Sequence, residues 1–115
     1  MKIYHLKTCD TCRKAVKALR AAGYAPELHD VRADGLTHAL LKSLEKALGY
    51  EALVNKKSTT WRRLSDSQKS DISRESALAL LSENPTLMKR PVIEQGGNFT
   101  VGWTKAVQAE YGINE

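Results

Sequence analysis

The spacing of hydrophobic residues changes along the chain and predicts where strands give way to helices. A short apolar-rich run over residues 2–6 predicts a buried strand, and residues 27–31, after Pro26, predict a second strand. Between these runs the apolar positions recur at helical spacing, and Gly23 ends the predicted helix. These positions are Cys12, Ala15, Val16, Leu19 and Ala22. The tight connection predicts a β-α-β unit with two parallel strands and a right-handed crossover.

The middle of the chain, about residues 36–85, predicts a helical insert. Three Ser or Thr residues precede an apolar stripe or a capping-box pattern and are the expected N-caps: Thr37, Ser65 and Ser73. The first of these helices is expected to end at Gly49, and the last is expected to end at Asn84-Pro85. The polar, basic segment over residues 55–63 is predicted to be a loop.

The last third of the chain returns to strands. Residues 91–95 and 99–103 are predicted strands, and Gly96-Gly97-Asn98 between them is typical of a hairpin turn. Thr104 is expected to cap a terminal helix that runs through Tyr111. The predicted order is therefore β-α-β, a helical insert, and β-β-α. Without the insert this is the thioredoxin/glutaredoxin arrangement, so the whole chain is predicted to be a single α/β domain of that kind.

The composition is that of an ordinary soluble domain and excludes some classes of protein. Hydrophobic residues make up 42% of the chain and charged residues 27%. No apolar run approaches the roughly 18 residues of a membrane span, and the N-terminus lacks the features of a signal peptide, so we expect a cytoplasmic protein without membrane association. The net charge of +5 leaves an acidic partner, a small anion or a solvated basic surface open. The few aromatic residues do not alternate with basic ones, so direct nucleic-acid binding is not expected.

Two cysteines, Cys9 and Cys12, are the only ones in the sequence and lie at the start of the first predicted helix. Unpaired backbone N–H groups and the helix dipole at such a position lower a thiol pKa from its free value of about 8.5. A Cys-x-x-Cys pair in the cytosol is usually redox-active or metal-binding. Structural zinc normally needs four ligands from cysteine and histidine. Besides its two cysteines, the sequence offers only three scattered histidines. We therefore predict a thiol-based redox protein without a metal or a tightly bound cofactor.

The chain resembles the arsenate reductase (ArsC)/Spx/YffB family of thioredoxin-like proteins over essentially its whole length. Four stretches carry the resemblance: Ile3-Tyr4-His5 with Cys9-x-Thr11-x-Arg13; Glu51-Ala52-Leu53; Asn84-Pro85 leading to Lys89-Arg90-Pro91-Val92-Ile93; and Val101-Gly102-Trp103. The run from Thr59 to Leu64, together with Asp34-Gly35-Leu36, is most similar to the YffB branch.

The resemblance implies roles for particular residues. Cys9 matches the nucleophilic cysteine of the family, and His5 matches a histidine that lowers the pKa of that cysteine. Arg90 matches an arginine that binds the oxyanion, which suits the planar fork of a guanidinium. Pro91 matches the proline that stands opposite the active cysteine. The residues expected to bind substrate are Thr11, Arg13, Lys56, Arg62 and Pro91.

Two departures from the family pattern alter these expectations. Two further arginines of the arsenate reductases are replaced here by Asn55 and Gly102. Loss of one donor to a developing oxyanion slows an enzyme by roughly 10²–10³-fold, so arsenate turnover is expected to be weakened unless nearby lysines or arginines substitute. The second departure is Cys12, which Spx-type regulators share. It is expected to act as a resolving thiol that closes a disulfide with Cys9.

Two functions remain open from the sequence. The leading hypothesis is a cytosolic thiol oxidoreductase of the arsenate reductase/YffB type. It would act on a small oxyanion or a disulfide and be recycled through Cys12, by glutathione as co-substrate with glutaredoxin, or by thioredoxin. The alternative is an Spx-like redox-sensing transcription regulator that binds RNA polymerase, with Cys9 and Cys12 as its switch.

Overall fold

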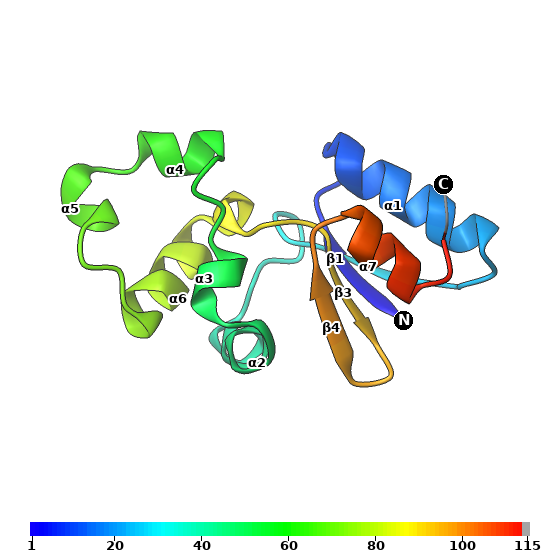
Figure 1. Cartoon of the computed structure of the whole chain (residues 1–115). Coiled ribbons are helices and arrows are strands. Elements are labelled where there is room, and N and C mark those ends of the chain that lie inside the picture. Colours follow the sequence, from blue (N-terminus) through cyan, green and yellow to red (C-terminus); the bar gives the residue numbers. More distant parts are fainter. Residues whose placement is uncertain (114–115) are drawn as a thin grey trace. The chain divides into compact units, whose positions relative to one another are not determined.

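The computed structural model describes residues 1–113, which fall into two compact units (Figure 1). The first unit combines Met1–Asp34 with the chain from Arg90 onward, and the second unit is Gly35–Lys89. The second unit covers nearly the same residues as the predicted helical insert. That the chain acts as a single domain stays a prediction.

The first unit contains a four-stranded mixed sheet in the order β2-β1-β3-β4. Its elements are β1 (Lys2–His5), α1 (Asp10–Ala21), β2 (Glu27–Asp30), β3 (Val92–Gln95), β4 (Asn98–Val101) and α7 (Lys105–Glu110). Strands β1 and β2 are parallel, whereas β3 is antiparallel to both β1 and β4. The predicted β-α-β and β-β-α segments and the parallel pairing of the first two strands are confirmed.

The core of the first unit lies between the sheet and the helices α1 and α7 (Figure 1). Ile3 of β1 pairs with Ile93 of β3, and both side chains are fully buried. Val16 and Leu19 of α1 pack against this pair, and Val107 of α7 packs against the same cluster. The apolar stripe read from the sequence is thus the face by which α1 covers the sheet.

The hairpin between β3 and β4 is tighter than the sequence predicted. Gln95 pairs directly with Asn98, so the turn consists of Gly96 and Gly97 alone, with φ of 56° and 85°. Two successive residues with positive φ form a type I′ turn, which matches the twist of the flanking strands. Asn98 therefore begins β4 rather than belonging to the turn, and β4 ends at Val101, two residues earlier than predicted.

The second unit is built from short helices that mostly begin at Ser or Thr. They are α2 (His38–Leu48), α3 (Tyr50–Leu53), α4 (Thr59–Arg63), α5 (Asp66–Lys69), α6 (Arg74–Glu83) and the 3₁₀ helix η1 (Pro85–Leu87). The predicted caps are confirmed. The side-chain oxygens of Thr37, Ser65 and Ser73 each accept a hydrogen bond of 3.2 Å from the backbone N–H of the residue three positions later. The fully buried side chains include Leu41, Leu44, Leu53, Leu81, Leu87 and Met88.

The segment predicted to be a loop, residues 55–63, contains helix α4, so that prediction was wrong. Ser58 caps the helix by accepting a hydrogen bond of 3.1 Å from the backbone N–H of Trp61. The helix has no buried residue, and Lys56 and Lys69 lie over its Trp61 ring at 5.7 and 6.0 Å. Because this single turn has no apolar stripe, hydrophobic spacing could not reveal it.

None of the helices in residues 1–113 is both long enough and apolar enough to cross a bilayer.

Candidate active site

Cys9 is the N-cap residue of α1, with φ and ψ of −85° and 118°. Its backbone N–H donates to the Leu6 carbonyl at 2.9 Å, and its carbonyl accepts the Arg13 N–H at 3.0 Å. The Cys9 side chain is half-buried, whereas Cys12, one turn into the helix, is completely buried. Both cysteines thus lie at the start of α1, where backbone N–H groups without a helical partner favour a negative charge on a nearby sulfur.

The pKa of Cys9 is the balance of opposing effects. Burial raises the pKa of this thiol, but hydrogen bonds from the backbone N–H and the thiol of Cys12 lower it. The guanidinium of Arg90 lowers it further by donating a hydrogen bond and by its positive charge. The net pKa of Cys9 is lower than that of an ordinary thiol, so the thiolate is enriched at neutral pH.

Cys12 shows the opposite behaviour. Its pKa is raised to about 12, chiefly by burial and further by its hydrogen bond to Cys9 and the negative charge of Cys9. A hydrogen bond from the Leu6 backbone and the charge of Arg90 oppose this effect without reversing it. In the reduced protein Cys12 thus remains a protonated thiol that donates to the Cys9 thiolate. Cys9 is thus the thiol of the pair that ionises more readily, and Cys12 is its proton-bearing neighbour.

Arg90 and Pro91 lead directly into β3, which begins at Val92. The Arg90–Pro91 peptide bond is cis, an isomer that the sequence did not predict. Pro91 is fully buried, and its carbonyl accepts the Gly102 N–H at 2.9 Å. Of the residues expected in the site, the structure brings Arg90 into contact with Cys9, which agrees with its place in the resemblance.

His5 ends β1 and is half-buried. Burial lowers its pKa and His29 lowers it further, while the carboxylates of Asp30 and Asp34 raise it, and the net pKa is below the ordinary value. The imidazole is therefore mostly neutral at pH 7. The groups that shift Cys9 are Cys12 and Arg90, and the role predicted for His5 in lowering the Cys9 pKa stays a prediction.

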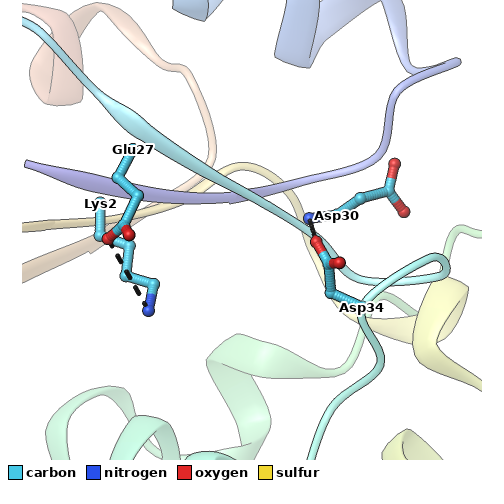
Figure 2. A network of polar contacts seen from close by, with 4 residues as sticks. All are labelled: Lys2, Glu27, Asp30 and Asp34. Atoms are coloured by element: carbon cyan, nitrogen blue, oxygen red, sulfur yellow. Dashed lines mark hydrogen bonds and ion pairs between the residues drawn. The ribbon is translucent and has the colours of Figure 1, made fainter.

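Asp30 organises the chain beside His5. One oxygen of its carboxylate accepts the Lys7 N–H at 3.0 Å, and the other accepts the Arg32 and Ala33 N–H groups at 2.8 Å each. Figure 2 shows the carboxylate of Asp34 accepting the Asp30 backbone N–H at 2.9 Å. Asp30 was not among the predicted site residues. The signal was available, because pairing the two predicted parallel strands in register places His5 beside Asp30.

The figure also shows the other end of the same strand pair. There Lys2 of β1 and Glu27 of β2 face each other at 4.0 Å, an exposed pair (Figure 2). Such an exposed ion pair contributes little to stability. It lies three residue pairs along the strands from the His5–Asp30 pair and is therefore outside the candidate site.

The predicted substrate-binding residues Thr11 and Arg13 are exposed on the first turns of α1. Arg13 Nε donates to the Lys7 carbonyl at 3.0 Å, and its Nη1 lies 3.6 Å from Asp10. Arg13 thus ties the helix to the segment that precedes Cys9.

Lys56 and Arg62 belong to the second unit and are exposed there. Arg62 Nη2 donates to the Lys57 carbonyl at 3.3 Å. At the two positions where the resemblance places further arginines of the arsenate reductases, Asn55 accepts the Lys57 N–H at 3.0 Å, and Gly102 has a φ of 84°. A residue with a side chain is strained at such a φ, so the backbone itself favours glycine over arginine at that position.

The described residues hold no group of three or more His, Cys, Asp or Glu side chains arranged to bind a metal ion.

A mixed four-stranded sheet with a cysteine pair at the start of its first helix defines the thioredoxin-like class of α/β proteins. Comparisons with known proteins narrow this class. Residues 4–110 match the model of the ArsC family. An uncharacterized protein of Haemophilus influenzae is 44% identical over 110 residues, which cover 95% of this chain and 96% of that protein.

Solved structures agree with this match. A protein named YFFB is 33% identical, with a TM-score of 0.89 over 96% of both chains. An arsenate reductase (ArsC) related protein from Brucella melitensis is 34% identical, with a TM-score of 0.78 over 97% of this chain and 94% of its own. An arsenate reductase from Vibrio cholerae is 26% identical, with a TM-score of 0.77 over 89% of this chain and 90% of its own. The chain belongs to the ArsC family, and its predicted thioredoxin-like α/β fold is confirmed.

Proposed function

We propose that this protein is a cytoplasmic thiol-dependent reductase of the arsenate reductase/YffB type, in which the Cys9 thiolate attacks a small oxyanion or a disulfide. The observation that carries the proposal is the lowered pKa of Cys9 at the N-terminus of α1, produced by contacts with Cys12 and Arg90. Membership of the ArsC family and likeness to proteins named arsenate reductase support it.

The chemistry requires two successive displacements at sulfur. With a disulfide substrate, Cys9 forms a bond to one sulfur while the other sulfur leaves as a thiolate. Cys12 then loses its proton and attacks the Cys9 sulfur, so that the Cys9–Cys12 bond forms and the second substrate sulfur leaves. The substrate gains two electrons, and the cysteine pair loses two.

With arsenate, Cys9 displaces an oxygen, which leaves as water, and forms a sulfur–arsenic bond. Attack by Cys12 on the Cys9 sulfur then leaves that bonding pair on arsenic, which is reduced from the +5 to the +3 state. Arg90, which already contacts the Cys9 sulfur, is the group proposed to hold the oxyanion.

The buried position of Cys12 suits the second displacement. While Cys9 is a thiolate, its charge and hydrogen bond help to keep Cys12 protonated. Once Cys9 is bonded to substrate that charge is gone, which makes deprotonation of Cys12 easier. The oxidised pair is proposed to be returned to thiols by glutathione with glutaredoxin, or by thioredoxin.

The test is arsenate-dependent oxidation of NADPH in two coupled systems, one with glutathione, glutaredoxin and glutathione reductase, the other with thioredoxin and its reductase. We expect turnover in one of them and its loss, by at least about a thousandfold, in Cys9→Ser. Cys12→Ser is expected to accumulate the mixed adduct with substrate, observed by mass spectrometry. Turnover that persists in Cys9→Ser would refute the mechanism.

A second candidate is a redox-sensing regulator of the Spx type that binds RNA polymerase. The hydrogen bond between Cys9 and Cys12 favours it, because the two sulfurs are already in contact for closing a disulfide switch. A pull-down with the C-terminal domain of the polymerase α-subunit, with reduced and oxidised protein in parallel, tests this candidate. Absence of binding in both states excludes it.

A further inference from the structure

A basic groove runs along α1 in the first unit. It is a cavity of about 430 Å³, lined by the cationic side chains of Lys7, Arg13, Lys17 and Arg20, by His5, and by the apolar side chains of Val16 and Leu28. Arg13, Lys17 and Arg20 recur at helical spacing, so their charges lie along one face over about 10 Å of the helix. No carboxylate lines the groove, although Arg13 lies 3.6 Å from exposed Asp10 beside it.

The groove also contains an exposed apolar side chain, that of Leu28. Leu28 is 38% exposed and is the most exposed large hydrophobic side chain among residues 1–113. It lies on β2, an edge strand of the described sheet, and its pairing with Ile3 places it on the sheet face that α1 covers. Leu28 therefore adds an apolar side chain to a groove whose lining is otherwise mainly cationic.

The groove is lined by residues close to Cys9 in the sequence, although Cys9 itself does not line it. Lys7 is two residues before Cys9, and the Arg13 N–H donates to the Cys9 carbonyl. A ligand held along α1 would therefore reach Lys7, two residues before Cys9 along the chain. This placement links the groove to the choice of what Cys9 attacks.

We propose that this groove binds an acidic segment of a protein partner that carries an apolar side chain, and so directs Cys9 to disulfides within acidic sequences. The proposal rests on the proposed function in its disulfide form. A peptide supplies carboxylates for the cations and an alkyl side chain for Leu28 on a single chain, whereas a phosphodiester backbone supplies only the charge.

The reaction on such a partner is the two-step exchange given above. Cys9 bonds to one sulfur of the partner disulfide and releases the other as a thiolate; Cys12 then bonds to Cys9 and releases the first sulfur. The partner becomes a dithiol, and this protein carries the Cys9–Cys12 disulfide.

The experiment uses short peptides whose single cysteine is joined to thionitrobenzoate, because attack by Cys9 releases the coloured thiolate. Three peptides are compared: Glu-Glu-Leu-Glu-Cys, the same sequence with Lys for Glu, and a neutral Gly-Gly-Ala-Gly-Cys. We expect the acidic peptide to react with the protein at least about tenfold faster than the basic one, and the ratio to fall as salt is added.

Variants localise the effect. Lys17→Ala with Arg20→Ala is expected to remove most of the preference for the acidic peptide without changing the rate with the neutral peptide. Leu28→Ser is expected to remove the advantage of the acidic peptide over a fourth peptide, Glu-Glu-Ala-Glu-Cys, which has Ala in place of Leu. The matched control, Lys42→Ala with Lys46→Ala on α2 of the second unit, is expected to keep the preference.

Equal rates with the acidic and basic peptides, or a preference that survives Lys17→Ala with Arg20→Ala, would overturn the proposal. So would inhibition by a single-stranded oligonucleotide at concentrations at which the acidic peptide does not compete. A fluorescent acidic peptide with Ser in place of Cys measures binding by anisotropy without any thiol reaction. Binding of this peptide by a protein whose Cys9 does not react with the neutral probe would support the groove and contradict only the proposed function.

Discussion

Arg90 and Arg62 show how the two compact units use the same side chain differently. In the first unit Arg90 is half-buried and donates to the Cys9 sulfur, where it stabilises the thiolate. In the second unit Arg62 is exposed on a one-turn helix and donates to the carbonyl of Lys57 nearby in the chain. A strongly basic composition is therefore a poor guide to chemistry. A cation changes the reactivity of a group only where burial brings the two into contact in a low dielectric.

The same contrast extends to how each unit is stabilised. The first unit rests on a sheet whose strands come from both ends of the sequence, with Ile3 paired to Ile93. The second unit is formed by residues contiguous in sequence, and its helices begin at side-chain caps such as Thr37 and Ser73. A site formed by Cys9 and Arg90 needs the long-range pairing of the first unit.

The largest effects on stability are expected from truncating one buried side chain in the core of each unit separately. Leu19→Ala in α1 and Leu81→Ala in α6 each remove a fully buried side chain and should lower the free energy of unfolding by about 2–5 kcal/mol. The chain provides one tryptophan per unit, Trp103 in the first and Trp61 in the second. If the chain is a single domain, the fluorescence of Trp61→Phe and of Trp103→Phe should report the same denaturant midpoint.

Both core variants are then expected to shift that common midpoint. Separate transitions for the two tryptophans, with each leucine variant moving only the transition of its own unit, would contradict the single-domain prediction.

Arg90→Ala against Arg62→Ala tests the comparison of the two arginines. Loss of the Arg90 hydrogen bond and charge destabilises the Cys9 thiolate, so its pKa should rise and less thiolate should remain at pH 7. Alkylation by iodoacetamide, which follows the thiolate, should slow about tenfold at pH 7 and recover as the pH is raised. Arg62→Ala should leave this pH profile unchanged.

The two variants also test the predicted substrate-binding role of Arg62. If that prediction holds, Arg62→Ala and Lys56→Ala should each raise KM for an anionic substrate. The pH dependence of Cys9 alkylation should stay that of the wild-type protein. An altered profile in Arg62→Ala would contradict the separation of roles.

Cys12 permits a test with two replacements that differ in one respect. Cys12→Ser keeps a hydroxyl that can donate to the Cys9 sulfur, whereas Cys12→Ala removes the donor. Neither can form a disulfide with Cys9. Because the Cys12 side chain lowers the Cys9 pKa by donating to it, Cys12→Ala should slow alkylation at pH 7 several-fold and Cys12→Ser should slow it less. Equal rates in the two variants would mean that the backbone N–H and Arg90 suffice.

Sequence patterns predicted local structure well where a signal was strong. The caps at Thr37, Ser65 and Ser73 follow from side-chain hydrogen bonding three residues along the chain, which a short window contains. Helix α4 was missed because its five residues carry no apolar stripe, although Ser58 offered the same capping signal. One turn of helix stabilised by a cap falls below what hydrophobic periodicity can detect.

In the candidate site, too, the features that depend on neighbouring residues could be predicted, whereas those that depend on long-range contacts could not. Cys9 and Cys12 were evident from their spacing at a helix start, since the relevant N–H groups are local. The contact with Arg90 came from the family resemblance, because no local pattern links residues 81 positions apart. The proximity of His5 to Asp30 could have been obtained from strand register, but the burial that lowers the His5 pKa depends on the packed fold.

The smallest expected effect concerns α4, the helix that hydrophobic spacing missed. Ser58→Ala removes the acceptor of the Trp61 N–H at 3.1 Å and the hydroxyl that donates to the Asn55 carbonyl at 2.7 Å. Loss of an N-cap typically costs about 1 kcal/mol, and we expect a loss of that size in the free energy of unfolding. The neighbouring Thr59→Ala is the matched control, because its exposed side chain does not cap the helix, and it should change stability by less than about 0.5 kcal/mol. Chemical denaturation followed by Trp61 fluorescence measures both. Equal effects of the two substitutions would show that the Ser58 cap does not hold this turn, and that α4 owes its stability to contacts such as those of Lys56 and Lys69 with the Trp61 ring.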